Sequence, residues 1–180
     1  MELFEAIERR HSYRGPMLNE GVPRSDLVRI VQAGIQAPSG YNAQTTTFVV
    51  VDDPDTLARL GAIDPQCGVL QQARAVIACI VPRGPTPGDS RLFFGAEDCS
   101  AATENMLLAI TALGYASVWL EGWLRLGDHG AAVADVLGVP KERAVKVLLP
   151  LGRPARIESQ HPKLPWAARA WFGRYGGKAP

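Results

Sequence analysis

The stretch DCSAATENMLLAITALG, residues 98–114, decides the fold. Small and apolar residues occupy most of its positions, so a helix formed here has no wide polar face. Such a helix is normally central and buried on most sides, and Gly114 is a suitable residue to end it. The sequence therefore predicts one buried central helix, around which the rest of the chain has to pack.

Four short apolar segments on either side of this helix have the composition of strands. They are residues 47–51 (TFVVV), 75–81 (AVIACIV), 117–120 (SVWL) and 145–151 (VKVLLPL). Helical patterns precede the first strand at residues 3–14 and 27–37, and others follow Asp53-Pro54 and Asp128. Strands that alternate with helices predict a layered α/β or α+β domain.

Composition places the chain among ordinary globular proteins. Its 180 residues suit one domain, and 47% hydrophobic residues, 21% charged residues and a net charge of +1 indicate neither disorder nor nucleic-acid binding. No segment approaches the roughly 18 apolar residues of a membrane span, and no signal-peptide core is present, so we expect no membrane partner and a cytoplasmic location. Cys67, Cys79 and Cys99 lack paired spacing, so we expect reduced thiols and no metal.

The segment RRHSYRGP, residues 9–16, gathers three arginines, a histidine and a serine behind the first helical pattern. If that helix continues to Pro16, Arg10 and Arg14 extend its buried face. Both guanidinium groups can donate in pairs to phosphate oxygens, and the Ser12 hydroxyl adds another donor. Taken alone, the cluster is better explained as a solvated helix end, where cations suit the helix dipole; the alternative is an anion site.

Two further segments carry hydrogen-bonding groups next to strands. PSGYNAQ, residues 38–44, is rich in turn formers, but a turn leaves the amides of Asn42 and Gln44 unexplained; these suit a planar heterocycle or the loop backbone. In WLEGW, residues 119–123, the Glu121-Gly122 pair permits a tight turn with accessible N–H groups, whereas the tryptophans are at least as readily core and rim aromatics. Rossmann, P-loop and nucleophile-elbow motifs are absent, so any phosphate is held by side chains.

In their order along the chain, four segments resemble the FMN-dependent nitroreductase family. They are RRHSYR (9–14), VPRSDLVRIVQAGIQAPSGYNAQ (22–44), DCSAATENMLLAITALGYASVWLEGW (98–123), and LGVP with LLPLGRP (137–140 and 148–154). The resemblance spans about residues 3–165 and implies an α+β fold, a three-layer α/β/α sandwich with a central, mostly antiparallel sheet. It also implies an intertwined homodimer with two FMN molecules at the interface. Residues 1–180 would form one domain, with residues 153–180 as an extension packing on the partner subunit.

The resemblance also implies which residues bind FMN. In chain order these are Arg10, His11, Ser12 and Arg14; Pro38, Ser39 and Gly40; Asn42 and Gln44; Leu120, Glu121 and Gly122; and Lys163. The group from Arg10 to Arg14 would contact the phosphate and the pyrimidine edge of the ring. The group from Pro38 to Gly40 would reach the flavin from the partner subunit. The side-chain amides of Asn42 and Gln44 would stabilise the flavin. The segment from Leu120 to Gly122 would present backbone N–H groups to flavin N5 and O4. Lys163, or more weakly His161, would add a cation at the phosphate.

The function implied by the resemblance is that of an oxidoreductase in which FMN carries the chemistry. Hydride would pass from NAD(P)H through the flavin to a nitroaromatic, a quinone or a similar small conjugated acceptor, by a ping-pong mechanism. No side chain is needed as acid or base, and Arg14 and the Glu121-Gly122 segment would tune the ring. The segment 61–97 is shorter than the corresponding segment of relatives that carry helices over the substrate cleft. The alternatives are a flavin-dependent oxidase or dehalogenase on the same scaffold, and a non-catalytic flavin-binding protein.

Overall fold

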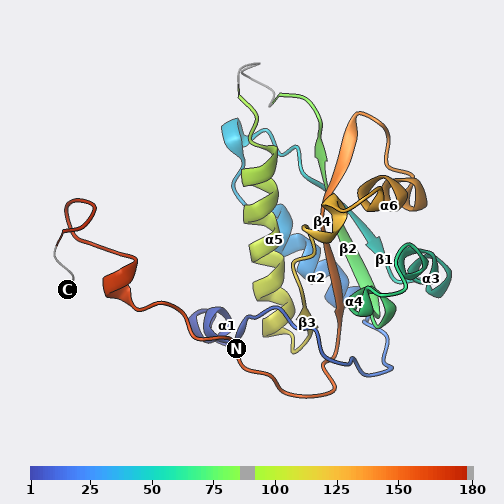
Figure 1. The fold of residues 1–180 in the computed structure, drawn as a ribbon, viewed down its shortest axis with the longest axis horizontal. Coiled ribbons are helices and arrows are strands. Elements are labelled where there is room, and N and C mark those ends of the chain that lie inside the picture. The colour runs from blue at the N-terminus through green and yellow to red at the C-terminus, as the bar shows by residue number, and fades with distance from the viewer. Residues whose placement is uncertain (86–91, 178–180) are drawn as a thin grey trace.

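A four-stranded sheet lies between two layers of helices in the computed structural model, which describes residues 1–85 and 92–177 (Figure 1). The strands are β1 (Thr47–Val51), β2 (Ala75–Pro82), β3 (Ala116–Ser117) and β4 (Arg143–Gly152). Their order is β1-β2-β4-β3, and each neighbouring pair is antiparallel. The expected α+β sandwich with an antiparallel sheet is confirmed.

The helix α5 (Gly95–Ala112) begins three residues before the predicted start and packs on one face of the sheet together with α2 (Arg24–Ile35). Met106 and Ile110 of α5 are buried against Ile77 of β2 in this core. A Cβ atom on Gly34 of α2 would come within 2.9 Å of Met106 Cγ, so a glycine at this position allows the two helices to approach closely. The prediction of a buried central helix is therefore confirmed.

The opposite face of the sheet carries α3 (Pro54–Ala62), α4 (Gly68–Gln71) and α6 (His129–Leu137). Alternate residues of β2 point to the two faces, Ile77 towards α5 and Val76 towards this second core. Both faces of the strand are covered, which explains its uninterrupted apolar sequence. As expected, Asp53 caps α3 by accepting a hydrogen bond of 2.8 Å from Thr56 N.

Two expected elements end early. The helix α1 (Leu3–Arg9) stops before Arg10, so the continuation through Arg14 was wrong. After Arg9 the backbone is extended because it pairs with the edge of the sheet, where Tyr13 N donates to Ser117 O at 2.9 Å. The expected strand 117–120 is also wrong beyond Ser117, since only Leu120 pairs again, through two hydrogen bonds of 3.0 Å with Leu148.

Three single-turn helices, η1 (Gly40–Asn42), η2 (Trp123–Arg125) and η3 (Trp166–Ala168), complete the described elements. After β4 the chain runs past α1 and away from the sheet (Figure 1). The glycine and proline pattern of residues 83–88 also predicts a loop, of which residues 86–88 lie outside the described residues, as do residues 178–180 of the C-terminal extension. Among the described helices, none has both the length and the apolar character to cross a membrane.

Replacement of Met106 by alanine tests the close packing of α5 on α2. Met106 is fully buried, so the loss of its side chain should leave a cavity and lower the free energy of unfolding by about 2–5 kcal/mol. Val28 of α2 is 66% exposed, and Val28→Ala should change it by less than about 0.5 kcal/mol. Urea unfolding followed by circular dichroism compares the two variants; equal effects would contradict the packing.

Candidate functional site

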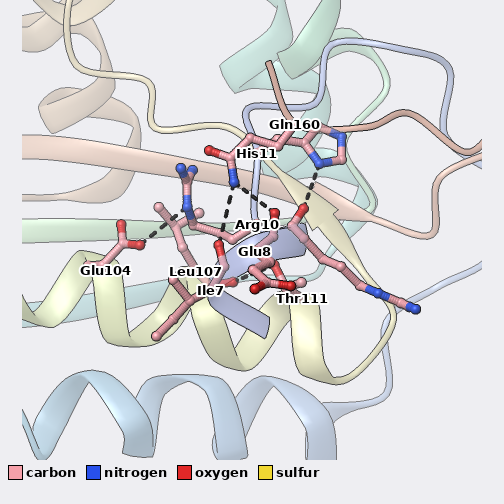
Figure 2. A network of polar contacts seen from close by, with 9 residues as sticks. Ile7, Glu8, Arg10, His11, Glu104, Leu107, Thr111 and Gln160 are labelled. Carbon is pink, nitrogen blue, oxygen red and sulfur yellow. Dashed lines mark hydrogen bonds and ion pairs between the residues drawn. The ribbon is translucent and has the colours of Figure 1, made fainter. Parts of the chain in front are cut away.

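The basic segment begins where the chain leaves α1, beside α5 (Figure 2). Arg10 Nε lies 3.2 Å from Glu104 Oε1 of α5, so α5 orients this guanidinium group. His11 Nδ1 lies 2.8 Å from Arg9 O, and because a carbonyl oxygen only accepts, Nδ1 is the donor. In the neutral ring His11 Nε2 is then an acceptor; it is buried and has no partner among the described residues. An unsatisfied buried acceptor of this kind is free to meet a donor on a ligand.

The extended backbone after Arg10 separates the side chains of this segment onto two sides. Tyr13 and Gly15 are buried, whereas Ser12 and Arg14 are exposed. The Tyr13 hydroxyl donates to Pro16 O at 2.7 Å and so fixes the bend that follows. The Ser12 hydroxyl and the Arg14 guanidinium group therefore both lie on the exposed side of the segment. Pairing with the sheet edge, instead of helix formation, produces this presentation.

A cavity of about 530 Å³ adjoins the segment and is bounded by α5 and by the start of the C-terminal extension. Arg10 and His11 line it from one side, and residues 156–160 from the other. Gln160 Nε2 donates to Ile7 O and Glu8 O, at 3.4 and 2.8 Å, so the extension satisfies two carbonyl groups at the end of α1 (Figure 2). The cavity wall is therefore tied to the basic segment.

Glu121 and Gly122 follow the Leu120–Leu148 pairing directly. The Glu121 carboxylate lies 2.8 Å from Lys146 Nζ of β4 and also binds Arg125. The hydrogen bond with Lys146 holds the pKa of Glu121 below its usual value, against the opposing effect of burial, and Arg125 adds to the lowering. The side chain of Glu121 is thus occupied within the chain, which leaves the backbone N–H groups as the donors available here.

No contact or backbone angle among the described residues requires glycine at position 122. Its φ and ψ angles, −55° and −40°, are open to any residue, and an added Cβ atom would meet nothing within 4 Å. The open space beside Gly122 is therefore the kind of place where a flat ligand can approach the backbone closely. Gly40 is different, because a Cβ atom there would lie 2.2 Å from the Phe94 ring, so packing alone requires that glycine.

The loop 38–44 is held at the N-terminal end of α5. Gly40 N donates to Asp98 Oδ1 at 2.9 Å, and Ser39 Oγ accepts from Gln44 N at 3.0 Å. Tyr41, Asn42 and Gln44 all have φ angles of 50–54°, a left-handed conformation that is unusual outside glycine. Sequence reasoning missed Asp98 as the residue that holds this loop; its signal was a carboxylate near the start of a helix that is buried on most sides.

Within one chain the predicted site residues fall into separate places. β3 brings the basic segment near the residues that lead to Leu120–Gly122, but the loop 38–44 lies at the other end of α5 (Figure 1). Pro38, Ser39 and Gln44 line a second cavity, of about 230 Å³, which no residue of the basic segment borders. Lys163 and His161 are exposed on the extension. The chain therefore presents parts of a site on distinct surfaces.

Comparisons with known proteins agree with this fold. The sequence model of the nitroreductase family matches residues 7–79 and 64–153. A "Putative NADH dehydrogenase/NAD(P)H nitroreductase" of Archaeoglobus fulgidus is 35% identical over 155 residues, 85% of this chain and 86% of that protein. An "NADPH-flavin oxidoreductase" of Vibrio harveyi is 29% identical over 155 residues, 80% of this chain and 63% of that protein.

A solved structure has the same fold along nearly its whole length. It is a Bacteroides thetaiotaomicron protein described in the same words as the Archaeoglobus fulgidus relative. It superposes with a TM-score of 0.81 at 29% identity and covers 96% of this chain and 98% of its own. The chain belongs to the nitroreductase family, so the resemblance expected from its motifs and the oxidoreductase class are confirmed.

The residues present fit the FMN that this family implies. The exposed Arg14 and Ser12 and the guanidinium group of Arg10 are suitable donors to a phosphate. The unpartnered Nε2 of His11 and the open backbone at Gly122 are features that contacts among the described residues do not explain. A ligand with an anionic group, hydroxyl donors and a flat ring system accounts for all of them together.

The ion pairs of Glu121 should make stability depend on pH in a defined direction. The lowered pKa means that they stabilise the folded state above the ordinary value of 4.5, and that the gain is lost as the pH falls through the lowered value. Glu121→Gln should therefore cost about 1 kcal/mol at neutral pH, and the cost should shrink as the pH falls below 4.5 and through the lowered pKa. Urea unfolding at a series of pH values measures this; a pH-independent cost would contradict the ionic origin. Glu20→Gln is the exposed control, with its carboxylate 3.6 Å from Arg153 Nε.

Proposed function

We propose that the protein is an FMN-dependent NAD(P)H oxidoreductase that works as a homodimer with two FMN sites at the subunit interface. When bound, FMN supplies hydride transfer between NAD(P)H and a conjugated acceptor, such as a nitroaromatic compound or a quinone. The observation that carries the proposal is the pairing of the basic segment with β3, at Ser12 and Ser117, which connects it to the segment that ends in the open backbone at Gly122. Relatives named NAD(P)H nitroreductase and NADPH-flavin oxidoreductase support it.

The residues of this chain have binding and tuning roles in the proposed reaction. Arg10, Ser12 and Arg14 hold the phosphate and the pyrimidine edge of the ring, at about 1.5–3 kcal/mol for each hydrogen bond to a charged group. The backbone N–H groups of Glu121 and Gly122 donate to the ring, where fixed donors stabilise charge better than mobile water does. No side chain has to give or take a proton, which agrees with the engagement of the Glu121 carboxylate by Lys146.

The separation of the site residues supports the dimer. A loop that cannot meet the basic segment of its own chain can meet that of a second copy, and then Pro38, Ser39 and Gly40 complete the partner's site. Leu3 and Phe4 of α1 are 61% and 77% exposed, and Ile157 and Tyr175 of the C-terminal extension are 100% and 90% exposed. Apolar surface of this extent marks an interaction site, and packing of the extension on the partner subunit would cover it.

The breadth of acceptors is supported by the short length of chain between β2 and α5. β2 ends at Pro82 and α5 begins at Gly95, which leaves little chain to cover a substrate cleft. A site with one exposed ring face has to serve NAD(P)H and the acceptor in turn. The proposal is therefore a ping-pong reaction with a small, flat, conjugated acceptor, in a protein without a nucleic-acid or membrane partner.

Purified protein should carry FMN, identified by its visible spectrum and by mass spectrometry of the released ligand. Double-reciprocal plots against NAD(P)H at several acceptor concentrations should be parallel, because both substrates use the same ring face. A protein that stays colourless after incubation with FMN would refute the cofactor, and intersecting lines would refute the shared face. Slow reduction by NAD(P)H alone would favour the oxidase or dehalogenase alternative.

Mixed dimers test the proposed two-chain site. Arg10→Glu places a carboxylate against the phosphate, and Ser39→Trp fills the space over the ring, so each variant alone should form dimers without flavin. In a heterodimer of the two variants, one site combines both substitutions and the other has neither. We therefore expect about half the wild-type flavin content and activity.

The heterodimer is purified through different tags on the two variants. Circular dichroism and size-exclusion chromatography check that each parent folds and dimerises. Heterodimers as colourless as both folded parents would contradict the shared site and would assign the loop at Ser39 to its own subunit.

A further inference from the structure

Trp123, the residue after Gly122, is held by two side chains from the face of the sheet that carries α3, α4 and α6. Its indole Nε1 donates a hydrogen bond of 2.8 Å to Asp64 Oδ2, in the loop between α3 and α4. His129, the first residue of α6, stacks on the indole with ring centroids 4.3 Å apart and an interplanar angle of 26°. The Trp123 carbonyl accepts from His129 Nδ1 at 3.0 Å. Trp123 thus joins the loop between α3 and α4, and also α6, to the segment that contains Gly122.

Asp64 is itself fixed. Its other carboxylate oxygen, Oδ1, accepts a hydrogen bond of 3.0 Å from Gln66 N, which closes a local turn. The hydrogen bond from Trp123 lowers the pKa of Asp64, and the Gln66 N–H group lowers it further, so the carboxylate stays ionised at neutral pH. A charged acceptor makes a stronger and more directional hydrogen bond than a neutral one. The indole is therefore held at a defined place and angle.

The residue on the other side of Gly122 is anchored as well. Glu121 is bound to Lys146 of β4, and the preceding Leu120 is paired in both directions with Leu148. Glycine has the greatest backbone freedom of any residue. Within this turn the Glu121 and Gly122 carbonyl groups accept hydrogen bonds from Leu124 N and Arg125 N, at 3.0 and 3.1 Å. With Glu121 and Trp123 also tied to the framework by their side chains, contacts within the turn and outside it together set the direction of the N–H groups.

We propose that Asp64, Trp123 and His129 are positioning residues, which fix the backbone N–H groups of Glu121 and Gly122 in the direction that the flavin ring requires. This inference rests on the proposed function, because it assigns these N–H groups to the flavin. None of the three residues needs to touch the ring. Donors that are oriented before the ligand arrives stabilise developing charge without reorganisation, and support from surrounding residues is what keeps such donors in place.

The variant Trp123→Phe separates positioning from simple packing. Phenylalanine keeps an aromatic ring against His129 and removes the donor to Asp64. The matched control is Trp119→Phe, the same chemical change on the other flank of the segment, where the indole packs against the core between the sheet and α5. In FMN-loaded protein, Trp123→Phe should slow flavin reduction by NAD(P)H about tenfold or more, with the KM for NAD(P)H within about twofold of wild type. Trp119→Phe should stay within about twofold for both.

A second readout needs no flavin. Hydrogen–deuterium exchange of the backbone amides at residues 121–124 should become at least about tenfold faster in flavin-free Trp123→Phe and stay unchanged in Trp119→Phe. Asp64→Ala should reproduce both effects, and the double variant Asp64→Ala/Trp123→Phe should be no worse than either single variant, because one hydrogen bond is removed in each case. Asp64→Asn, which keeps an acceptor oxygen, should restore most of the reduction rate.

The proposal would be overturned if Trp123→Phe lost thermal stability but matched Trp119→Phe in exchange and in reduction rate. It would also be overturned if the effects of Asp64→Ala and Trp123→Phe multiplied in the double variant. Failure of wild-type protein to bind FMN is a separate result, which refutes the proposed function. In that case the exchange comparison on flavin-free protein still decides whether the three residues fix the segment.

Discussion

The burial of α5 against the sheet and against α2 is the constraint on which the other features of the molecule depend. Because this helix is covered on most sides, its few polar residues lie where other segments need a fixed partner. Asp98 in its first turns binds Gly40 N of the loop 38–44, and Glu104 in its middle binds Arg10. One buried helix thus sets both the positions of these segments and the separation between them.

The open backbone at Gly122 also depends on fixed partners from other segments. A ligand can approach closely only where no side chain intervenes, yet the absence of a side chain also removes any anchor at that residue. The two residues next to Gly122 are anchored instead, because Lys146 binds Glu121 and Asp64 binds Trp123. Open space and rigidity are therefore supplied by different residues.

Local sequence patterns predicted those parts of the fold that local interactions determine. The strand 47–51 and the helix capped by Asp53 were predicted because alternation, capping and proline placement act within a few residues. The end of α1 at Arg9 was not, because it depends on pairing between Tyr13 and Ser117, which are far apart in the chain. Likewise the motifs named Glu121, but only the folded chain brings Lys146 to it.

Division of a site between two chains has a thermodynamic consequence. If Arg10 and Arg14 hold the phosphate from one subunit while Ser39 reaches the ring from the other, FMN binds the dimer more tightly than the monomer. Binding equilibria are linked, so the ligand must then strengthen dimerisation by the same factor by which dimerisation strengthens ligand binding. In the proposed dimer, the exposed apolar residues of α1 and of the C-terminal extension would drive association without the cofactor, and the cofactor would complete it. An incomplete site on each chain would then link assembly of the dimer to the loading of both sites.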